Sequence, residues 1–245
     1  MGNLHYNFEG RTVIVTGAAR GIGMEVARLF HESGGEVFLV DFDAEQLGKA
    51  AADIGARGLV ADVSLTEDVE AVVARAVEET GRVDVVVNNA GILRDTVLWK
   101  LTDDDWDQVL DIHAGGTFRF TRACVPQFRA QQYGRVVNVT SYTGLHGNVG
   151  QANYATAKAG IIGFTKTAAK ELGRFGVTVN AISPNAETRM VATIPADKKA
   201  EVEAAMPLGR FGAPSEIAAA VAFLASEEAG YITGVVLPVD GGLSI

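Results

Sequence analysis

The feature that most constrains this sequence is a repeated alternation of short apolar runs with longer helical patterns. The short runs are nearly continuous in Val, Ile and Leu and lack the period-two polar pattern of a half-exposed strand. Such runs are typical of strands that are covered on both faces. We expect strands at residues 12–16, 37–41, 58–61, 83–88, 135–140, 177–183 and 234–239. We expect helices at residues 21–33, 43–54, 66–80, 103–131, 152–175 and 214–225.

Strands that alternate with helices along a chain are joined by right-handed crossovers and form a parallel sheet. The predicted fold is therefore α/β, with a single Rossmann-type, doubly wound parallel sheet of about seven strands and helices on both faces. No linker, low-complexity stretch or internal repeat interrupts the pattern, so we expect one domain over residues 1–245. Residues 184–210 depart from the pattern, with only a modest helical signal around 196–206. They follow the carboxyl end of a strand, where such sheets bind ligands, and we expect a substrate lid there rather than an inert loop.

Composition excludes several classes of protein. Hydrophobic residues make up 48% of the chain and charged residues 21%, which excludes intrinsic disorder. The formal charge of −9 disfavours binding to nucleic acid. The single cysteine, Cys124, excludes an internal disulfide and indicates a reducing compartment. The sequence shows no membrane helix, no signal peptide and no cluster with zinc spacing, so we expect a cytoplasmic protein without a metal.

A glycine-rich turn indicates a dinucleotide site. Residues 16–23 read Thr-Gly-Ala-Ala-Arg-Gly-Ile-Gly and lie between the first predicted strand and the first predicted helix. Glycines at 17, 21 and 23 permit a tight turn, a close approach to a pyrophosphate, and close packing of the helix on the strand. Free N–H groups at the start of the helix favour the phosphates. Three glycines alone could form a purely structural turn, but their place between strand and helix favours a dinucleotide.

The end of the second predicted strand indicates which dinucleotide is bound. Asp41 lies 24 positions after Gly17, where a carboxylate can accept hydrogen bonds from both adenosine ribose hydroxyls and repel a 2′-phosphate. Arg20 argues in the other direction, because a guanidinium can pair with that phosphate. Since specificity often depends on a repulsive group, we expect NAD(H) rather than NADP(H). The alternative interpretation of Asp41 is an ordinary helix cap.

Three residues form a candidate catalytic group. Tyr154 and Lys158 are four apart in a predicted helix and therefore share a face. The phenol has an ordinary pKa of about 10, which a neighbouring ammonium and a cationic nicotinamide would lower. Ser141 follows the fifth predicted strand, where its hydroxyl could hold a substrate oxygen. The pair could instead be an exposed helix face, whereas a serine hydrolase is disfavoured because no Gly-x-Ser-x-Gly turn surrounds Ser141.

Taken together, these features closely resemble the short-chain dehydrogenase/reductase family over nearly the whole chain. The matching segments are residues 16–23, Asp62-Val63, Asn88-Asn89-Ala90-Gly91, Ser141, Tyr154 with Lys158, residues 180–184, and residues 239–242. The resemblance implies that Tyr154 is the general acid/base and that Ser141 orients the substrate oxygen. It implies that Lys158 binds the nicotinamide ribose and lowers the pKa of Tyr154. The implied cofactor contacts are Gly17, Arg20, Gly21, Ile22, Gly23, Asp41, Phe42, Asp62, Val63, Asn89, Ala90, Gly91, Tyr154, Lys158, Pro184 and Thr188.

The sequence departs from the family pattern in two places. His113 stands where the family usually carries an asparagine that holds a water of the proton relay. Imidazole both donates and accepts hydrogen bonds, so His113 is either a relay residue or a structural histidine. Pro184-Asn185 replaces the usual Pro-Gly of the family. The segment from there to Thr188 is one residue shorter than in the family pattern. The resemblance implies that Thr188 reaches the nicotinamide carboxamide.

These departures favour one substrate class. Residues 91–95, 113, 147–154 and 184–186 resemble the (3R)-hydroxyacyl-CoA dehydrogenase domain of multifunctional β-oxidation enzymes, and residues 207–210 also resemble bacterial 3-oxoacyl-acyl-carrier-protein reductases. We therefore expect an NAD(H)-dependent oxidoreductase of lipid metabolism, acting on a 3-hydroxyacyl or 3-oxoacyl thioester of CoA or acyl carrier protein. Alternatives are a dehydrogenase of a steroid, cyclic alcohol or sugar derivative, and a non-enzymatic NAD(H)-sensing or assembly protein. The apolar C-terminus and the resemblance predict a homotetramer.

Overall fold

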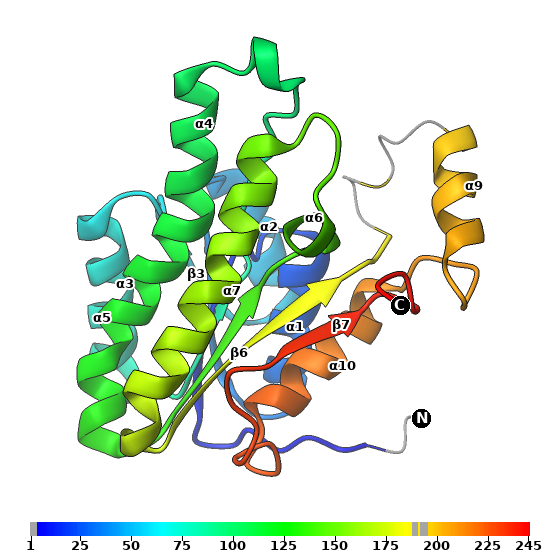
Figure 1. Ribbon diagram of the computed structural model, residues 1–245. Coiled ribbons are helices and arrows are strands. Elements are labelled where there is room, and N and C mark those ends of the chain that lie inside the picture. Colours follow the sequence, from blue (N-terminus) through cyan, green and yellow to red (C-terminus); the bar gives the residue numbers. More distant parts are fainter. Residues whose placement is uncertain (1–3, 188–190, 192–195) are drawn as a thin grey trace.

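The computed structural model describes residues 4–187, 191 and 196–245, and a parallel seven-stranded sheet forms its centre (Figure 1). The strands are β1 (Thr12–Thr16), β2 (Glu36–Asp41), β3 (Arg57–Val60), β4 (Val85–Asn88), β5 (Gly134–Val139), β6 (Val177–Pro184) and β7 (Val236–Val239). The longer helices are α1 (Gly21–Glu32), α2 (Ala44–Ile54), α3 (Thr66–Thr80), α4 (Asp103–Leu110), α5 (Gly116–Gln131), α7 (Ala152–Leu172), α9 (Ala196–Ala205) and α10 (Pro214–Ala225).

The strand order is β3-β2-β1-β4-β5-β6-β7, and every neighbouring pair is parallel. The chain therefore builds outward from β1 to β3 and then returns to place β4 on the other side of β1. At this reversal the loops after β1 and β4 leave toward opposite faces, which opens a crevice at the carboxyl ends of the strands. The predicted fold class is confirmed.

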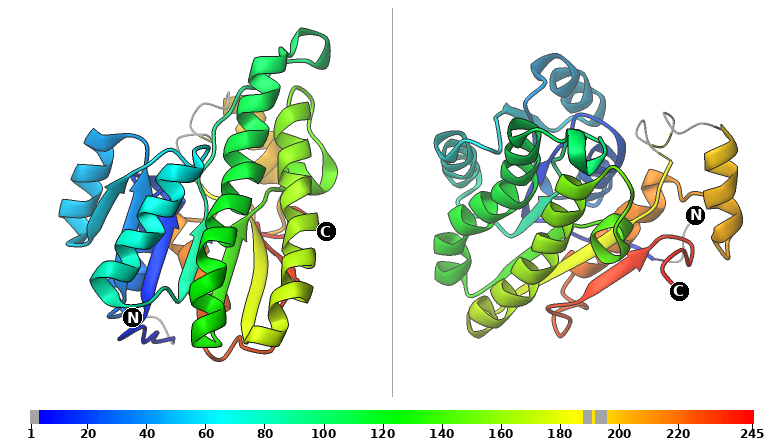
Figure 2. Two further views of the ribbon diagram at one scale, coloured as in Figure 1. Left: turned by 90° about the vertical axis from the view of Figure 1, so that its left-hand side faces the viewer. Right: turned by 45° about the horizontal axis from the view of Figure 1, so that its top comes forward.

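Helices cover both faces of the sheet (Figures 1 and 2). On one face α1 and α2 pack on β1 and β2, and α10 packs on β5 and β6; their buried side chains include Phe30, Leu47 and Ile217. On the other face α3, α5 and α7 bury an equally apolar layer that includes Phe120 and Phe128. Burial from both sides explains why the strand sequences are apolar at consecutive positions.

Two predicted helices differ from the observed ones. The segment predicted as one helix over 103–131 is divided by a π-helical turn, η2 (Asp111–Gly115), between α4 and α5. The segment predicted over 152–175 ends in a separate 3-10 turn, η3 (Gly173–Phe175). Two short elements have no counterpart in the prediction, the 3-10 turn η1 (Leu98–Lys100) and the five-residue helix α6 (Tyr142–His146).

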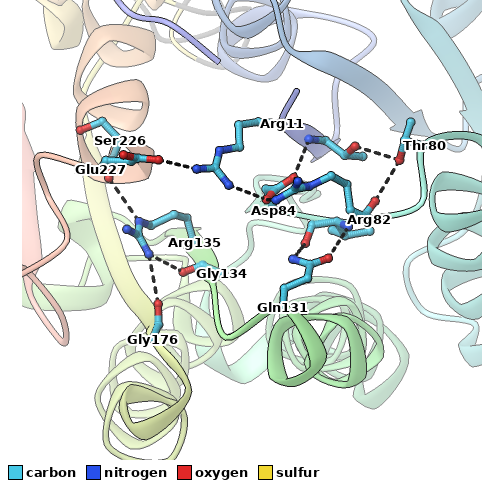
Figure 3. A network of polar contacts seen from close by, with 12 residues as sticks. Arg11, Thr80, Arg82, Asp84, Gln131, Gly134, Arg135, Gly176, Ser226 and Glu227 are labelled. Carbon is cyan, nitrogen blue, oxygen red and sulfur yellow. Dashed lines mark hydrogen bonds and ion pairs between the residues drawn. The ribbon is translucent and has the colours of Figure 1, made fainter. Parts of the chain in front are cut away.

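A polar network joins the amino ends of the strands, opposite the crevice (Figure 3). The buried Asp84 carboxylate accepts hydrogen bonds from the Thr12 backbone N–H at 2.9 Å, from Arg11 at 3.1 Å and from Arg82 at 2.6 and 2.7 Å. The nearby Arg135 side chain is also buried and donates to three carbonyl oxygens, those of Gly134, Gly176 and Ser226. This network fastens β1, β4 and β5 to the end of α10.

Candidate active site

A cavity of about 540 Å³ lies at the carboxyl ends of the strands. Residues from the loops after six different strands line it, which is the arrangement expected at the reversal point of a doubly wound sheet. The lining includes most of the residues implied from the sequence: Gly17, Arg20, Gly21, Ile22, Asp41, Phe42, Asp62, Val63, Asn89, Ala90, Gly91, His113, Ser141, Tyr154, Lys158 and Pro184.

Two glycines of the glycine-rich turn, Gly17 and Gly23, are packed too tightly for a side chain. Gly17 has φ +63°, and a Cβ there would lie 2.8 Å from the Ala90 Cα. A Cβ on Gly23 would lie 2.2 Å from the Gly17 carbonyl oxygen, so Gly23 lets α1 approach the turn and does not itself line the cavity. Asn89 fastens the turn by donating from Nδ2 to the carbonyls of Thr16 and Gly17, at 2.9 and 3.0 Å. The open cradle at the start of α1 fits a dinucleotide pyrophosphate.

Asp41 ends β2 beside this turn and is buried. Its Oδ2 accepts from the Ala19 N–H at 3.1 Å, and its Oδ1 accepts from the Asp43 N–H at 3.2 Å. The carboxylate is therefore fixed in place, and each oxygen keeps a further lone pair for a ribose hydroxyl. Arg20 lies 3.8 Å from Asp43 in an exposed ion pair, so its charge is partly directed away from Asp41.

One wall of the cavity consists of the segments after β2 and β3. Phe42 is 66% exposed although it lines the cavity, which leaves one aromatic face available to a ligand. Asp62 Oδ1 accepts from the N–H and the hydroxyl of Ser64, at 2.8 and 2.7 Å, and this turn holds Val63 against the cavity.

The candidate catalytic residues meet at the inner end of the same cavity. Tyr154 and Lys158 share one face of α7, and Ser141 precedes α6, where its Oγ accepts from the Thr143 N–H at 3.2 Å. Lys158 is buried and donates to the Val139 carbonyl at 2.7 Å, with its Nζ 5.5 Å from the centre of the Tyr154 ring. A substrate oxygen placed between Ser141 and Tyr154 would therefore have two hydroxyls within reach.

Burial sets the protonation states of these groups. It raises the pKa of Tyr154 to about 12, against the opposing effect of the Ser141 hydroxyl, and the negative Asp95 raises it further. Burial also lowers the pKa of Lys158 to about 7. The expected lowering of the Tyr154 pKa by Lys158 is therefore not seen among the protein groups alone, because loss of hydration outweighs it.

Comparison with known proteins identifies the family. The family model described as enoyl-(acyl carrier protein) reductase matches residues 17–244. The 3-oxoacyl-[acyl-carrier-protein] reductase FabG of Thermotoga maritima is 42% identical over 245 residues, covering 97% of this chain and 99% of the relative. The protein of that name from Escherichia coli is 42% identical over 241 residues, covering 97% and 98%. Nodulation protein G of Rhizobium sp. strain N33 is 39% identical over 243 residues, covering 98% and 99%.

The chain belongs to the short-chain dehydrogenase/reductase family. It is accordingly an oxidoreductase that interconverts a secondary alcohol and a ketone, and the family implies a nicotinamide cofactor. The cradle at Gly17 and the fixed carboxylate of Asp41 fit such a cofactor.

His113 lies in the π-helical turn η2 and is buried against the ring of Tyr154. The two rings meet edge to face, with 5.1 Å between their centres and 86° between their planes. Nε2 of His113 lies 2.8 Å from the Ile92 carbonyl oxygen and 3.1 Å from its N–H. Burial and the positive Lys158 lower the pKa of His113 to about 3, so the imidazole is neutral.

The segment after β6 is only partly described. Thr188 lies outside the described residues, so its expected contact with the carboxamide stays a prediction. Asn185, which replaces the usual glycine, lines the cavity, donates to the Met206 sulfur at 3.1 Å and pairs through its carbonyl with the Gly212 N–H at 3.1 Å. The start of residues 184–210 is thereby joined to the segment before α10.

Sequence reasoning missed several cavity residues. Arg94, Gln108 and Ile112 line the side of the cavity formed by the β4–α4 connection and α4. Ile112 could have been found, since it adjoins His113, but nothing in the local pattern distinguishes Gln108 from other polar helix residues. His146 is exposed and stacks on Tyr142, and it does not line the cavity.

Two structural searches bear on other functions. No helix in the described part of the chain is long and apolar enough to cross a membrane. Across residues 4–187, 191 and 196–245, no group of three or more His, Cys, Asp or Glu side chains is placed to hold a metal ion.

Proposed function

We propose that this short-chain dehydrogenase/reductase interconverts 3-hydroxyacyl and 3-oxoacyl thioesters with NAD(H), the acyl group being carried by CoA or by acyl carrier protein. The observation that carries the proposal is that Ser141, Tyr154, Lys158 and Asp41 all line one cavity. The thioester class is supported by the names of the relatives, which include 3-oxoacyl-[acyl-carrier-protein] reductases at 42% identity over nearly the full chain.

Each catalytic side chain has a separate task in this proposal. Bound in the cradle, the nicotinamide cofactor supplies or accepts the hydride. Ser141 Oγ donates a hydrogen bond to the substrate oxygen and orients it. In reduction the Tyr154 hydroxyl gives its proton to that oxygen, and in oxidation the Tyr154 phenolate takes the proton back. Lys158, held by the Val139 carbonyl, places a positive charge beside the phenolate.

The remaining roles concern cofactor and substrate binding. We assign the adenine to Phe42, Asp62 and Val63, the nicotinamide side to residues 89–91 and Pro184, and the nicotinamide ribose to Tyr154 and Lys158. Residues 184–210 act as a substrate lid in this proposal, with Thr188 on the carboxamide.

NAD(H) specificity is proposed on the basis of Asp41. Its carboxylate is held by two backbone N–H groups and cannot turn away from a 2′-phosphate. We expect Asp41→Ser to remove the repulsion, so that the ratio of kcat/KM for NADH to that for NADPH falls at least about tenfold. If the kcat/KM of the unaltered protein were as high with NADPH as with NADH, Arg20 and not Asp41 would decide the specificity.

A panel of carbonyl substrates tests the substrate class. Initial rates of NADH oxidation are compared for acetoacetyl-CoA, the corresponding acyl-carrier-protein thioester, and steroid, cyclic and sugar ketones. The proposal predicts the highest kcat/KM for a thioester. A higher value for another ketone assigns the enzyme to that alcohol, and tight NADH binding without turnover of any substrate favours the sensing or assembly function.

We also propose that each chain folds as a single domain and that four chains assemble into a cytoplasmic homotetramer. Exposed apolar side chains near the C-terminus, including Val235 and Ile245, support association. Light scattering should give about four times the 25.8 kDa chain mass, and a monomer mass would exclude this assembly.

A further inference from the structure

Thr140 lies between the end of β5 and Ser141, and its side chain contacts the helix that carries Tyr154. The residue is buried, and its N–H donates to the Ile182 carbonyl at 2.8 Å, which fixes it beside β6. Its hydroxyl Oγ1 donates to the main-chain carbonyl oxygen of Lys158 at 2.8 Å. A helix carbonyl has a second lone pair besides the one used in its helical bond, so this contact is an addition to α7. The sheet is therefore tied to α7 directly at Lys158.

The segment after Ser141 contacts α7 at the same place. A Cβ on Gly144, in α6, would lie 2.7 Å from the Lys158 Cβ and 2.8 Å from the Lys158 carbonyl carbon. The main chain of α6 therefore touches α7 there. The Lys158 ammonium also donates to the Val139 carbonyl at 2.7 Å. Residues before and after Ser141 along the chain thus hold the same lysine.

Ser141 and Tyr154 belong to separate elements, although a reacting oxygen between them must contact both hydroxyls. Ser141 lies in the turn after β5, and Tyr154 lies on α7, one helical turn before Lys158. The separation of the two hydroxyls therefore depends on how closely the turn approaches the helix. The bond from Thr140 to Lys158 spans this gap within one helical turn of Tyr154.

We infer that Thr140 is a positioning residue whose hydroxyl sets the distance between Ser141 and the face of α7 that carries Tyr154 and Lys158. Thr140 lines the cavity, but its hydroxyl donates to the helix and so acts through the main chain of Lys158. The inference rests on the proposed function for its effect on the rate, because that effect depends on the roles proposed for Ser141 and Tyr154.

Thr140→Val and Thr140→Ser separate the hydroxyl from the rest of the side chain. Valine has the shape of threonine but places a methyl group against the Lys158 carbonyl. A methyl carbon needs about 3.5 Å from an oxygen, so α7 must move away from the turn by several tenths of an ångström. Serine keeps the donor and loses only the methyl group.

Thr165→Val is the matched control, because Thr165 is a second buried threonine of α7. Its Oγ1 donates to the Ile161 carbonyl at 2.8 Å and accepts from Asn138 Nδ2 at 2.9 Å. It lies about two helical turns beyond Lys158 and does not line the cavity. This variant loses a buried hydroxyl of the same helix without releasing Lys158.

The rate of acetoacetyl-CoA reduction with NADH distinguishes positioning from folding. We expect kcat to fall about tenfold in Thr140→Val, because small errors in the placement of reacting groups are costly. Thr140→Ser should keep kcat within about threefold of the unaltered protein. Thr165→Val should lower the denaturant midpoint but leave kcat unchanged. Equal values of kcat in Thr140→Val and Thr140→Ser, or equal losses in Thr140→Val and Thr165→Val, would overturn the inference.

Crystal structures of the ligand-free proteins test the placement without any substrate. We expect the Tyr154 hydroxyl to lie several tenths of an ångström farther from Ser141 Oγ in Thr140→Val than in the unaltered protein. In Thr140→Ser and Thr165→Val the two hydroxyls should keep their separation. An unchanged separation in Thr140→Val contradicts the inference even if the enzyme reduces thioesters. The expected displacement in a protein that reduces no thioester would support the inference and contradict only the proposed function.

Discussion

At the scale of single residues, burial of the Lys158 side chain in the cavity lowers the stability of the folded protein. The ammonium is buried and its pKa is lowered to about 7, well below the usual value for lysine. The folded state therefore carries a penalty for the charged form that is fully present below pH 7. As the pH rises from 7 toward the ordinary lysine pKa, this penalty disappears.

Replacing Lys158 should consequently stabilise the protein while inactivating it. We expect Lys158→Met to raise the free energy of unfolding by about 1–3 kcal/mol at pH 7, with a smaller gain near pH 10. Denaturant unfolding at both pH values measures the effect. The account of this residue would be wrong if the variant were less stable at pH 7 than the unaltered protein.

At the scale of elements, the turn η2 packs against the loop after β4 only because Gly91 in that loop has no side chain. A Cβ on Gly91 would lie 2.2 Å from Cε1 of His113, and the ring cannot move away because Ile92 holds it. The π-helical turn and Gly91 therefore form one packing unit, and each requires the other.

We expect Gly91→Ala to lower the free energy of unfolding by about 1–3 kcal/mol and to weaken NADH binding. Gly48→Ala is the matched control, since Gly48 lies in α2 with open space around its Cα. That change should stabilise the protein by about 0.5–1 kcal/mol. Thermal unfolding of the two variants should shift in opposite directions, and a Gly91→Ala protein as stable as the control would contradict the packing described here.

The elements also show what the sequence can and cannot predict. Val-rich runs predicted all seven strands to within two residues at each end, because strands covered on both faces must be apolar. The division at η2 was missed, and the contact that His113 makes there is with Ile92, 21 residues earlier in the chain. Local periodicity carries no information about such a contact. The glycine turn and the pair on α7 were found because their spacing along the chain is itself the geometry of the site.

At the scale of the whole molecule, the buried polar network and the candidate active site lie at opposite ends of the sheet. The network around Asp84 and Arg135 lies at the amino ends of the strands, and the cavity lies at the carboxyl ends. Sequence reasoning did not find this network, because its members come from distant segments and each alone is an ordinary charged residue. Removing its central charge should therefore affect folding without affecting chemistry.

We expect Asp84→Asn to lower the free energy of unfolding by about 2–3 kcal/mol, because Arg11 and Arg82 lose their buried partner. The value of kcat should not change. As a control, Glu45→Gln removes only an exposed pair with Lys49 and should change stability by less than about 0.5 kcal/mol. A large fall in kcat for folded Asp84→Asn protein would show that the two ends of the sheet are coupled.

The most direct test of the central claim is the initial rate of NADH oxidation with acetoacetyl-CoA, measured in the unaltered protein and in Tyr154→Phe. The account predicts turnover that falls at least about a hundredfold in the variant, with the Kd for NADH little changed, because only the proton donor is removed. Turnover that persists in a well-folded Tyr154→Phe protein would contradict the assignment of Tyr154 as the acid/base, and with it the proposed mechanism.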